Sequence, residues 1–107
     1  MTQTIDLTPH DLAILQPILA ALLPAGTAVF VFGSRATGTA RRYSDLDLAL
    51  SGTTQLNPEA IARLQDALSD SDLTIKVDLV DLTTLDPAFR RIVEAEMITL
   101  SHENGPR

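Results

Sequence analysis

Residues 29–50 read VFVFGSRATGTARRYSDLDLAL, and they contain two predicted strands with a turn and a loop between them. An apolar run over residues 28–32 is typical of a strand buried on both faces. Residues 45–50 alternate acidic and apolar side chains, which predicts a second strand with one face in the core. Gly33 and Ser34 follow the first strand directly and predict a tight turn there.

The segments on either side predict three helices and one more strand. Each helix begins with a capping side chain followed by proline, at Thr8–Pro9, Asn57–Pro58 and Asp86–Pro87. From these caps and the apolar periodicity we expect helices over residues 9–23, 58–69 and 87–100, and a third strand over residues 75–80. The order helix, strand, loop, strand, helix, strand, helix predicts a small α/β fold in which helices cover a sheet.

Composition excludes several classes of protein. The 107 residues fit one domain, residues 1–107, with a tail over 101–107 that we expect to fray. There is no cysteine, and the histidines lie near opposite ends, which argues against disulfide and zinc sites. A net charge of −6 argues against direct nucleic-acid binding, because phosphate backbones are held by basic faces. Since no apolar run reaches about 18 residues and no signal peptide is recognisable, we expect a soluble, cytoplasmic protein that does not contact membranes.

Aspartates on the second and third strands are candidate metal ligands. Asp45 and Asp47 are two residues apart, so they lie on one face of their strand, about 6–7 Å apart. Taken alone, they also fit a solvated face of an edge strand. Asp78 lies between apolar residues of the third strand, where burial is costly unless the carboxylate is paired or binds a metal. If the two strands are neighbours, the three carboxylates make a magnesium site suited to nucleotide phosphates.

The turn and the loop after the first strand are candidates for phosphate contacts. Glycine at position 33 lets backbone approach a ligand, and backbone N–H groups of such a turn can hold phosphate, although Gly-Ser is often only a turn. Positive charge gathers nearby at Arg35, Arg41 and Arg42. These arginines fit either triphosphate neutralisation or a solvated loop. Lys76 shares a strand face with Asp78 and is a candidate partner for it or for phosphate.

Together, these motifs resemble the G-S-x10-D-x-D signature of the nucleotidyltransferase superfamily related to DNA polymerase β. Gly33-Ser34, ten residues and then Asp45-Leu46-Asp47 carry the signature. Residues 77–81, VDLVD, and residues 91–98, RIVEAEMI, resemble the third-aspartate strand and the closing helix of its minimal nucleotidyltransferase branch, so the likeness covers residues 29–100. The chain departs from that pattern at Thr37, where arginine is common, and at Arg42, where proline is common.

The resemblance implies a polymerase β-like α+β fold, with a mixed sheet of three to four strands, and a set of site residues. Asp45, Asp47 and Asp78 would be catalytic and would hold two Mg²⁺ ions, with Asp78 next to the acceptor hydroxyl. The nucleotide would be bound by Gly33, Ser34, Arg35, Arg41 and Ser44.

The resemblance also implies a function. Small members of this branch pair with HEPN-type toxins, so we expect a Mg²⁺-dependent, type VII-like antitoxin that transfers AMP from ATP to a tyrosine of such a toxin. The predicted elements occupy the whole chain, which favours an acceptor held by another macromolecule. The alternatives are an antitoxin that acts by binding alone and a nucleotidyltransferase for a small molecule. A Mg²⁺-dependent phosphohydrolase ranks last, because no nucleophile or histidine acid is evident.

Overall fold

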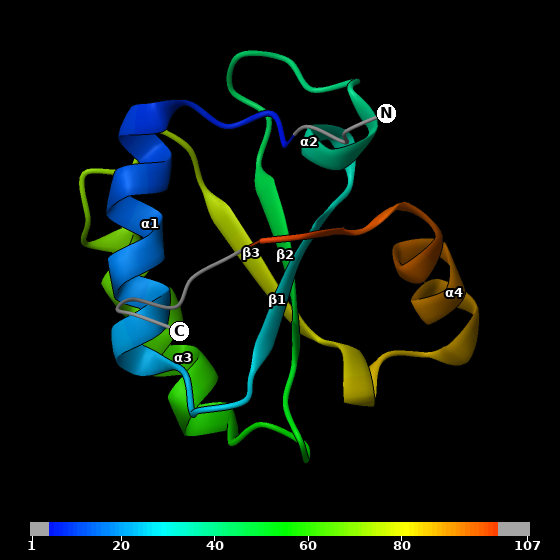
Figure 1. Ribbon diagram of the computed structural model, residues 1–107. Coiled ribbons are helices and arrows are strands. Elements are labelled where there is room, and N and C mark those ends of the chain that lie inside the picture. Colours follow the sequence, from blue (N-terminus) through cyan, green and yellow to red (C-terminus); the bar gives the residue numbers. More distant parts are fainter. Residues whose placement is uncertain (1–4, 101–107) are drawn as a thin grey trace.

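The computed structural model describes residues 5–100, which form a four-stranded mixed sheet flanked by helices (Figure 1). The elements are α1 (Pro9–Leu22), β1 (Ala28–Phe32), α2 (Ser34–Thr37), β2 (Leu46–Ser51), α3 (Pro58–Ser69), β3 (Val77–Asp81), a 3-10 helix η1 (Leu82–Thr84), α4 (Pro87–Glu96) and β4 (Ile98–Thr99). The tail over residues 101–107, which we expected to fray, lies outside the described residues. Among the described residues, no helix has the length and apolar character needed to cross a membrane.

The sheet has the strand order β3-β2-β1-β4, and it is mixed. Strand β1 pairs antiparallel with β2 and with β4, whereas β2 and β3 are parallel and are connected through α3. Figure 1 shows α1 and α3 on one side of the sheet and α4 on the other. The predicted α+β fold with a small mixed sheet is therefore confirmed.

The three predicted helix starts are confirmed. Thr8 Oγ1 accepts a hydrogen bond from the Asp11 N–H at 3.1 Å, and the side chains of Asn57 and Asp86 cap α3 and α4 in the same way. In each helix proline occupies the first position, where its missing N–H leaves no bond unmade.

The predicted end of the last helix is wrong. Helix α4 ends at Glu96 rather than at residue 100, and Ile98–Thr99 forms β4 against β1. The reason lies in β1, whose free edge offers backbone partners: the Leu100 N–H donates to the Val29 carbonyl at 2.8 Å. The short helix α2 was also missed, because four residues carry no helical periodicity.

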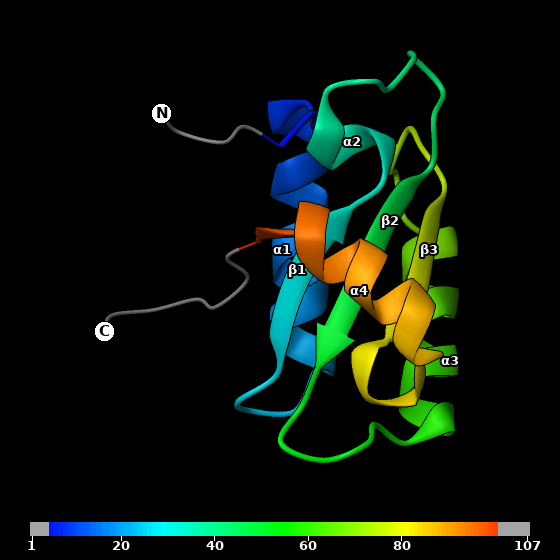
Figure 2. The same ribbon diagram turned by 90° about the vertical axis from the view of Figure 1, so that its right-hand side faces the viewer.

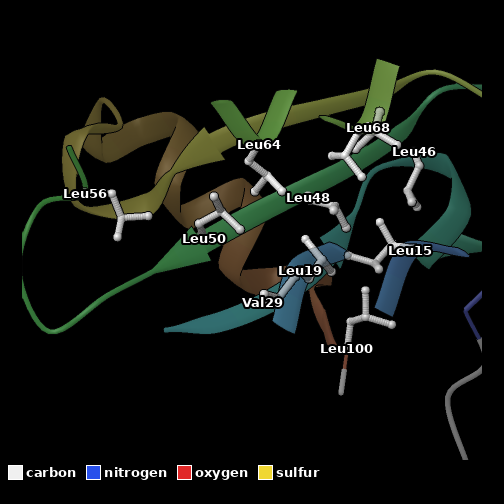
Figure 3. Packing of buried hydrophobic residues seen from close by; sticks show 12 residues of the cluster. Leu15, Leu19, Val29, Leu46, Leu48, Leu50, Leu56, Leu64, Leu68 and Leu100 are labelled. Atoms are coloured by element: carbon white, nitrogen blue, oxygen red, sulfur yellow. The ribbon is translucent and has the colours of Figure 1, made fainter. Parts of the chain in front are cut away.

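The larger core lies between the sheet and the helix pair α1 and α3 (Figure 3). Leu46, Leu48 and Leu50 alternate along β2 and all project into it, fully buried. A smaller cluster on the opposite face packs under α4; its buried members are Phe32, Ala49, Leu82 and Val93. Since strand side chains alternate, residues 47 and 49 of β2 lie on the face that α4 covers.

Candidate active site

Two of the predicted aspartates lie side by side on neighbouring strands. Asp47 of β2 is the register partner of Asp78 of β3, and the two strands are parallel. Neighbouring strands are about 4.8 Å apart, so both side chains lie close together on one face of the sheet. This is the face that carries the small cluster under α4, which crosses the sheet farther along the strands (Figure 2). The start of β2 and β3 therefore holds a pair of adjacent carboxylates beside the end of β1.

Asp45 lies one residue before β2 and is exposed. Its charge acts on Asp47 together with those of Asp78 and Glu96. Burial raises the pKa of Asp47 above the usual value, and the neighbouring charges of Asp78, Asp45 and Glu96 raise it further. Four carboxyl groups thus contribute to one region of negative charge. The negative charge around Asp47 is the kind of environment that a bound cation would stabilise.

Gly33 lies against the Asp47 carboxylate of this pair. Its backbone is in the left-handed region, with φ +74°. A Cβ atom at this position would collide with a carboxylate oxygen of Asp47 and would lie 3.3 Å from its Cγ. Only glycine fits between the end of β1 and Asp47, which explains the Gly-Ser turn that follows the strand. Ser34 is the first residue of α2, directly after this contact.

The amide of Gly33 already has an acceptor. Its N–H donates a hydrogen bond to Oε1 of Glu96, at 2.7 Å. A phosphate contact at this turn would therefore involve Ser34 and the close backbone approach at Gly33 rather than the Gly33 N–H. Sequence reasoning gave Glu96 no role in the site. No local pattern could have found it, since its partner is 63 residues away in the chain.

Lys76 forms the ion pair with Asp78 that the shared strand face predicted. The Nζ atom lies 3.9 Å from Oδ1 of Asp78, and both side chains are largely exposed. An exposed pair of this kind contributes little to stability. It nevertheless places one positive charge beside the carboxylates.

The side chain of Arg35 is engaged in contacts within the protein. Its guanidinium is buried and donates to the backbone carbonyls of residues 6, 41, 42 and 44, at 2.9–3.4 Å. An ion pair of 3.7 Å with Asp6 adds to these bonds. The bonds to residues 41, 42 and 44 stabilise the loop that precedes Asp45. The structure thus disfavours the predicted phosphate contact of Arg35, because protein carbonyls surround its N–H groups.

The other loop residues lie close to the start of β2. The hydroxyl of Ser44 accepts a hydrogen bond from the Arg41 N–H at 2.8 Å and so closes the turn before Asp45. The side chain of Arg42 stacks over the ring of Tyr43, with 5.3 Å from Cζ to the ring centroid. Arg41 and Arg42 are exposed, so they remain available to a ligand.

The residues present fit Mg²⁺ by donor type. Their oxygens are carboxylate oxygens, which magnesium prefers, and a cation would offset the repulsion that Asp47 experiences. Within residues 5–100, however, no group of three His, Cys, Asp or Glu side chains is arranged to hold a metal ion. The pairing of Asp47 with Asp78 is thus established by the strand register, while the three-aspartate metal set stays a prediction.

The chain is similar to known proteins over most of its length. The family model described as "Polymerase beta, Nucleotidyltransferase" matches residues 19–104. A protein of Haemophilus influenzae named "Probable protein adenylyltransferase MntA" is 40% identical over 99 residues, which are 92% of this chain and 86% of that protein.

Two solved structures extend the likeness to three dimensions. A toxin–antitoxin crystal structure with AMP-PNP contains a chain 30% identical to this one, with a TM-score of 0.66; the match covers 77% of this chain and 65% of that one. A structure of the tri-AMPylated Shewanella oneidensis HEPN toxin in complex with MNT antitoxin matches with 25% identity and a TM-score of 0.57, over 79% of this chain and 67% of the other. This chain thus spans about two thirds of the structural relatives it matches.

Proposed function

This chain belongs to the polymerase beta nucleotidyltransferase family, and on that premise we propose that it is a Mg²⁺-dependent protein adenylyltransferase that serves as an antitoxin. The observation that carries the proposal is the pairing of Asp47 with Asp78, together with the close approach of Asp47 to Gly33. The substrate is ATP and the acceptor is a partner HEPN toxin, in line with the names of the similar complexes. The acceptor group is a tyrosine hydroxyl, as the resemblance to the minimal nucleotidyltransferase branch implies. Because ATP is the donor, we place the protein in the cytoplasm.

The transfer exchanges one P–O bond for another. The tyrosine oxygen attacks the α-phosphorus of ATP, the bond between this phosphorus and the bridging oxygen of the β-phosphate breaks, and pyrophosphate leaves. The hydroxyl proton passes to the carboxylate of Asp78, which is half-exposed and so within reach of an acceptor. Tyrosine-O-AMP and pyrophosphate are the products.

Asp45, Asp47 and Asp78 would hold the two Mg²⁺ ions. When bound, the ions would neutralise the phosphates and stabilise both the attacking and the leaving oxygen of an in-line displacement. Around them, the turn at Gly33 and the hydroxyl of Ser34 would hold the β- and γ-phosphates. Arg41 and Ser44, at the turn before Asp45, are the further candidates for nucleotide contacts.

Replacing the first two aspartates separates catalysis from simple binding. The double variant D45N/D47N keeps side-chain size and removes two charges, so it should still form the complex with the toxin. If the proposal holds, cells that express the toxin together with this variant stop growing, whereas the wild type and the control D72N, an exposed loop residue, restore growth. Full neutralisation by D45N/D47N would contradict the enzymatic proposal and identify an antitoxin that acts by occlusion.

A further inference from the structure

Glu96 connects two parts of the chain that meet only in the folded protein. It is the last residue of α4, and its Oε1 atom accepts the 2.7 Å hydrogen bond from the Gly33 N–H. The pairing of β1 with β4 explains this meeting. Val31 is opposite Ile98, so two residues farther along β1 the register brings Gly33 to the end of α4. There the chain is helical, and the side chain of Glu96 takes the place of a strand partner.

Gly33 is therefore fixed from two sides. The Asp47 carboxylate lies against its Cα atom, and Glu96 holds its amide. Glycine has no side chain that could pack and fix the peptide, and its backbone moves readily between regions of φ. A hydrogen bond of 2.7 Å to the carboxylate oxygen sets the direction of the N–H. The contact thus determines how the turn faces the carboxylates.

We propose that Glu96 is a positioning residue, which holds the Gly33 turn against Asp47 in the arrangement that binding of a nucleoside triphosphate requires. The inference rests on the proposed function and adds to it a residue that acts through Gly33 rather than on the substrate. The length of the Glu96 side chain is the important property, because it brings the carboxylate to the Gly33 amide. The charge of Glu96 is a disadvantage at this place, because it adds to the repulsion on Asp47.

Two conservative variants separate reach from charge. E96Q keeps the length of the side chain and an acceptor oxygen but removes the charge. E96D keeps the charge but is one methylene shorter, so its carboxylate is withdrawn from the amide. The same substitutions at Glu94 are matched controls, because this residue lies on the same helix and pairs with Arg90 at the surface, at 3.4 Å.

The experiment measures binding of AMP-PNP with Mg²⁺ by calorimetry and exchange of the Gly33 amide by NMR. We expect E96D to lower the affinity by about tenfold, the effect of losing one hydrogen bond, and to expose the Gly33 amide to exchange. E96Q should bind within about threefold of the wild type and keep the amide protected, and the Glu94 variants should match the wild type.

The reverse order would overturn the proposal. If E96Q loses affinity and E96D keeps it, the charge of Glu96 matters and not its hold on Gly33. If both variants bind as the wild type does, Glu96 has no part in positioning the turn. A wild-type chain that binds no nucleotide would instead count against the proposed function, while the amide exchange of Gly33 would still report whether Glu96 holds it.

Discussion

Replacing Asp47 by asparagine should make the ligand-free protein more stable. Asp47 and Asp78 are register partners on adjacent strands, and Asp45 and Glu96 add to the negative charge around Asp47. Two unit charges about 5 Å apart repel each other by about 1 kcal/mol in water and about 3 kcal/mol at an effective dielectric constant of 20. The side chain of Asp78 is 48% exposed and pairs with Lys76, so the lower figure applies. Asparagine has the same shape and removes both the cost of burying a charge, which is the largest cause of the raised pKa, and the repulsion.

The expected gain of about 1 kcal/mol corresponds to a rise in Tm of roughly 4–6 °C for a domain of this size. The measurement is thermal unfolding in EDTA at pH 7, with D72N as the control for loss of one exposed charge. Because folding raises the pKa of Asp47 above its usual value of 3.8, ionisation opposes folding. The associated stability is complete below that value and is lost as the pH rises through the folded-state pKa. The advantage of D47N should therefore be present at pH 7 and shrink as the pH falls toward 3.8.

Mg²⁺ and AMP-PNP should reverse this order. A ligand at one hundred times its Kd stabilises the folded state by about 2.7 kcal/mol, and D47N should lack this gain. The wild type then becomes the more stable protein. Two results would refute the idea that the charge of Asp47 destabilises the free protein and is compensated by bound cations. One is a D47N variant no more stable than the wild type in EDTA, and the other is a D47N variant that gains as much stability from the ligand.

Three further substitutions test other parts of the account. D11N should cost about 2 kcal/mol in urea unfolding at pH 7, because the buried carboxylate accepts two hydrogen bonds from Thr74. Burial opposes ionisation of Asp11, but the hydrogen bonds from Thr74 outweigh it and lower the pKa of the carboxyl. The stability from these bonds is therefore present above the usual value of 3.8 and is lost as the pH falls through the lower folded-state pKa. An equal cost of D11N at pH 3 would contradict this. G33A should abolish detectable nucleotide binding in calorimetry and lower the Tm, since the new methyl group meets the Asp47 carboxylate; unchanged binding would show that the turn can move away. R35M should lower the free energy of unfolding by about 2–3 kcal/mol because several backbone carbonyls lose their donor, whereas normal stability with weakened nucleotide binding would restore the phosphate contact first predicted for Arg35.

The fold was predictable where the sequence carries a local signal. Cap-and-proline pairs marked all three long helices, and the alternation in residues 45–50 placed Asp47 on the face opposite the core leucines. Strand β4 has two residues, and it forms because the edge of β1 that does not pair with β2 offers it backbone partners. A helical pattern that continues past Glu96 looks the same in the sequence whether or not such an edge is present.

The pairing of Asp47 with Asp78 could be predicted from the sequence, whereas the contacts of Arg35 and Glu96 with the backbone could not. Asp47 and Asp78 lie on two predicted strands, and the parallel register of β2 with β3 brings their carboxylates side by side. The joining of Asp45 to this pair stays a prediction. The contacts of Arg35 and Glu96 join residues that no spacing relates. Arg35 bonds to backbone carbonyls, which every residue has, and Glu96 bonds to a backbone amide of another element. Such partners become visible only when the chain is folded.

Transfer of AMP to the toxin is tested by following the phosphates of ATP. The purified chain is incubated with Mg²⁺, a HEPN toxin with which it forms a complex, and ATP labelled at either the α- or the γ-phosphate. If the chain transfers AMP, the toxin acquires the α-label, the γ-label leaves with pyrophosphate, and D47N transfers neither. Incorporation of the γ-label, or no α-label on a toxin that the wild-type chain binds, would contradict it.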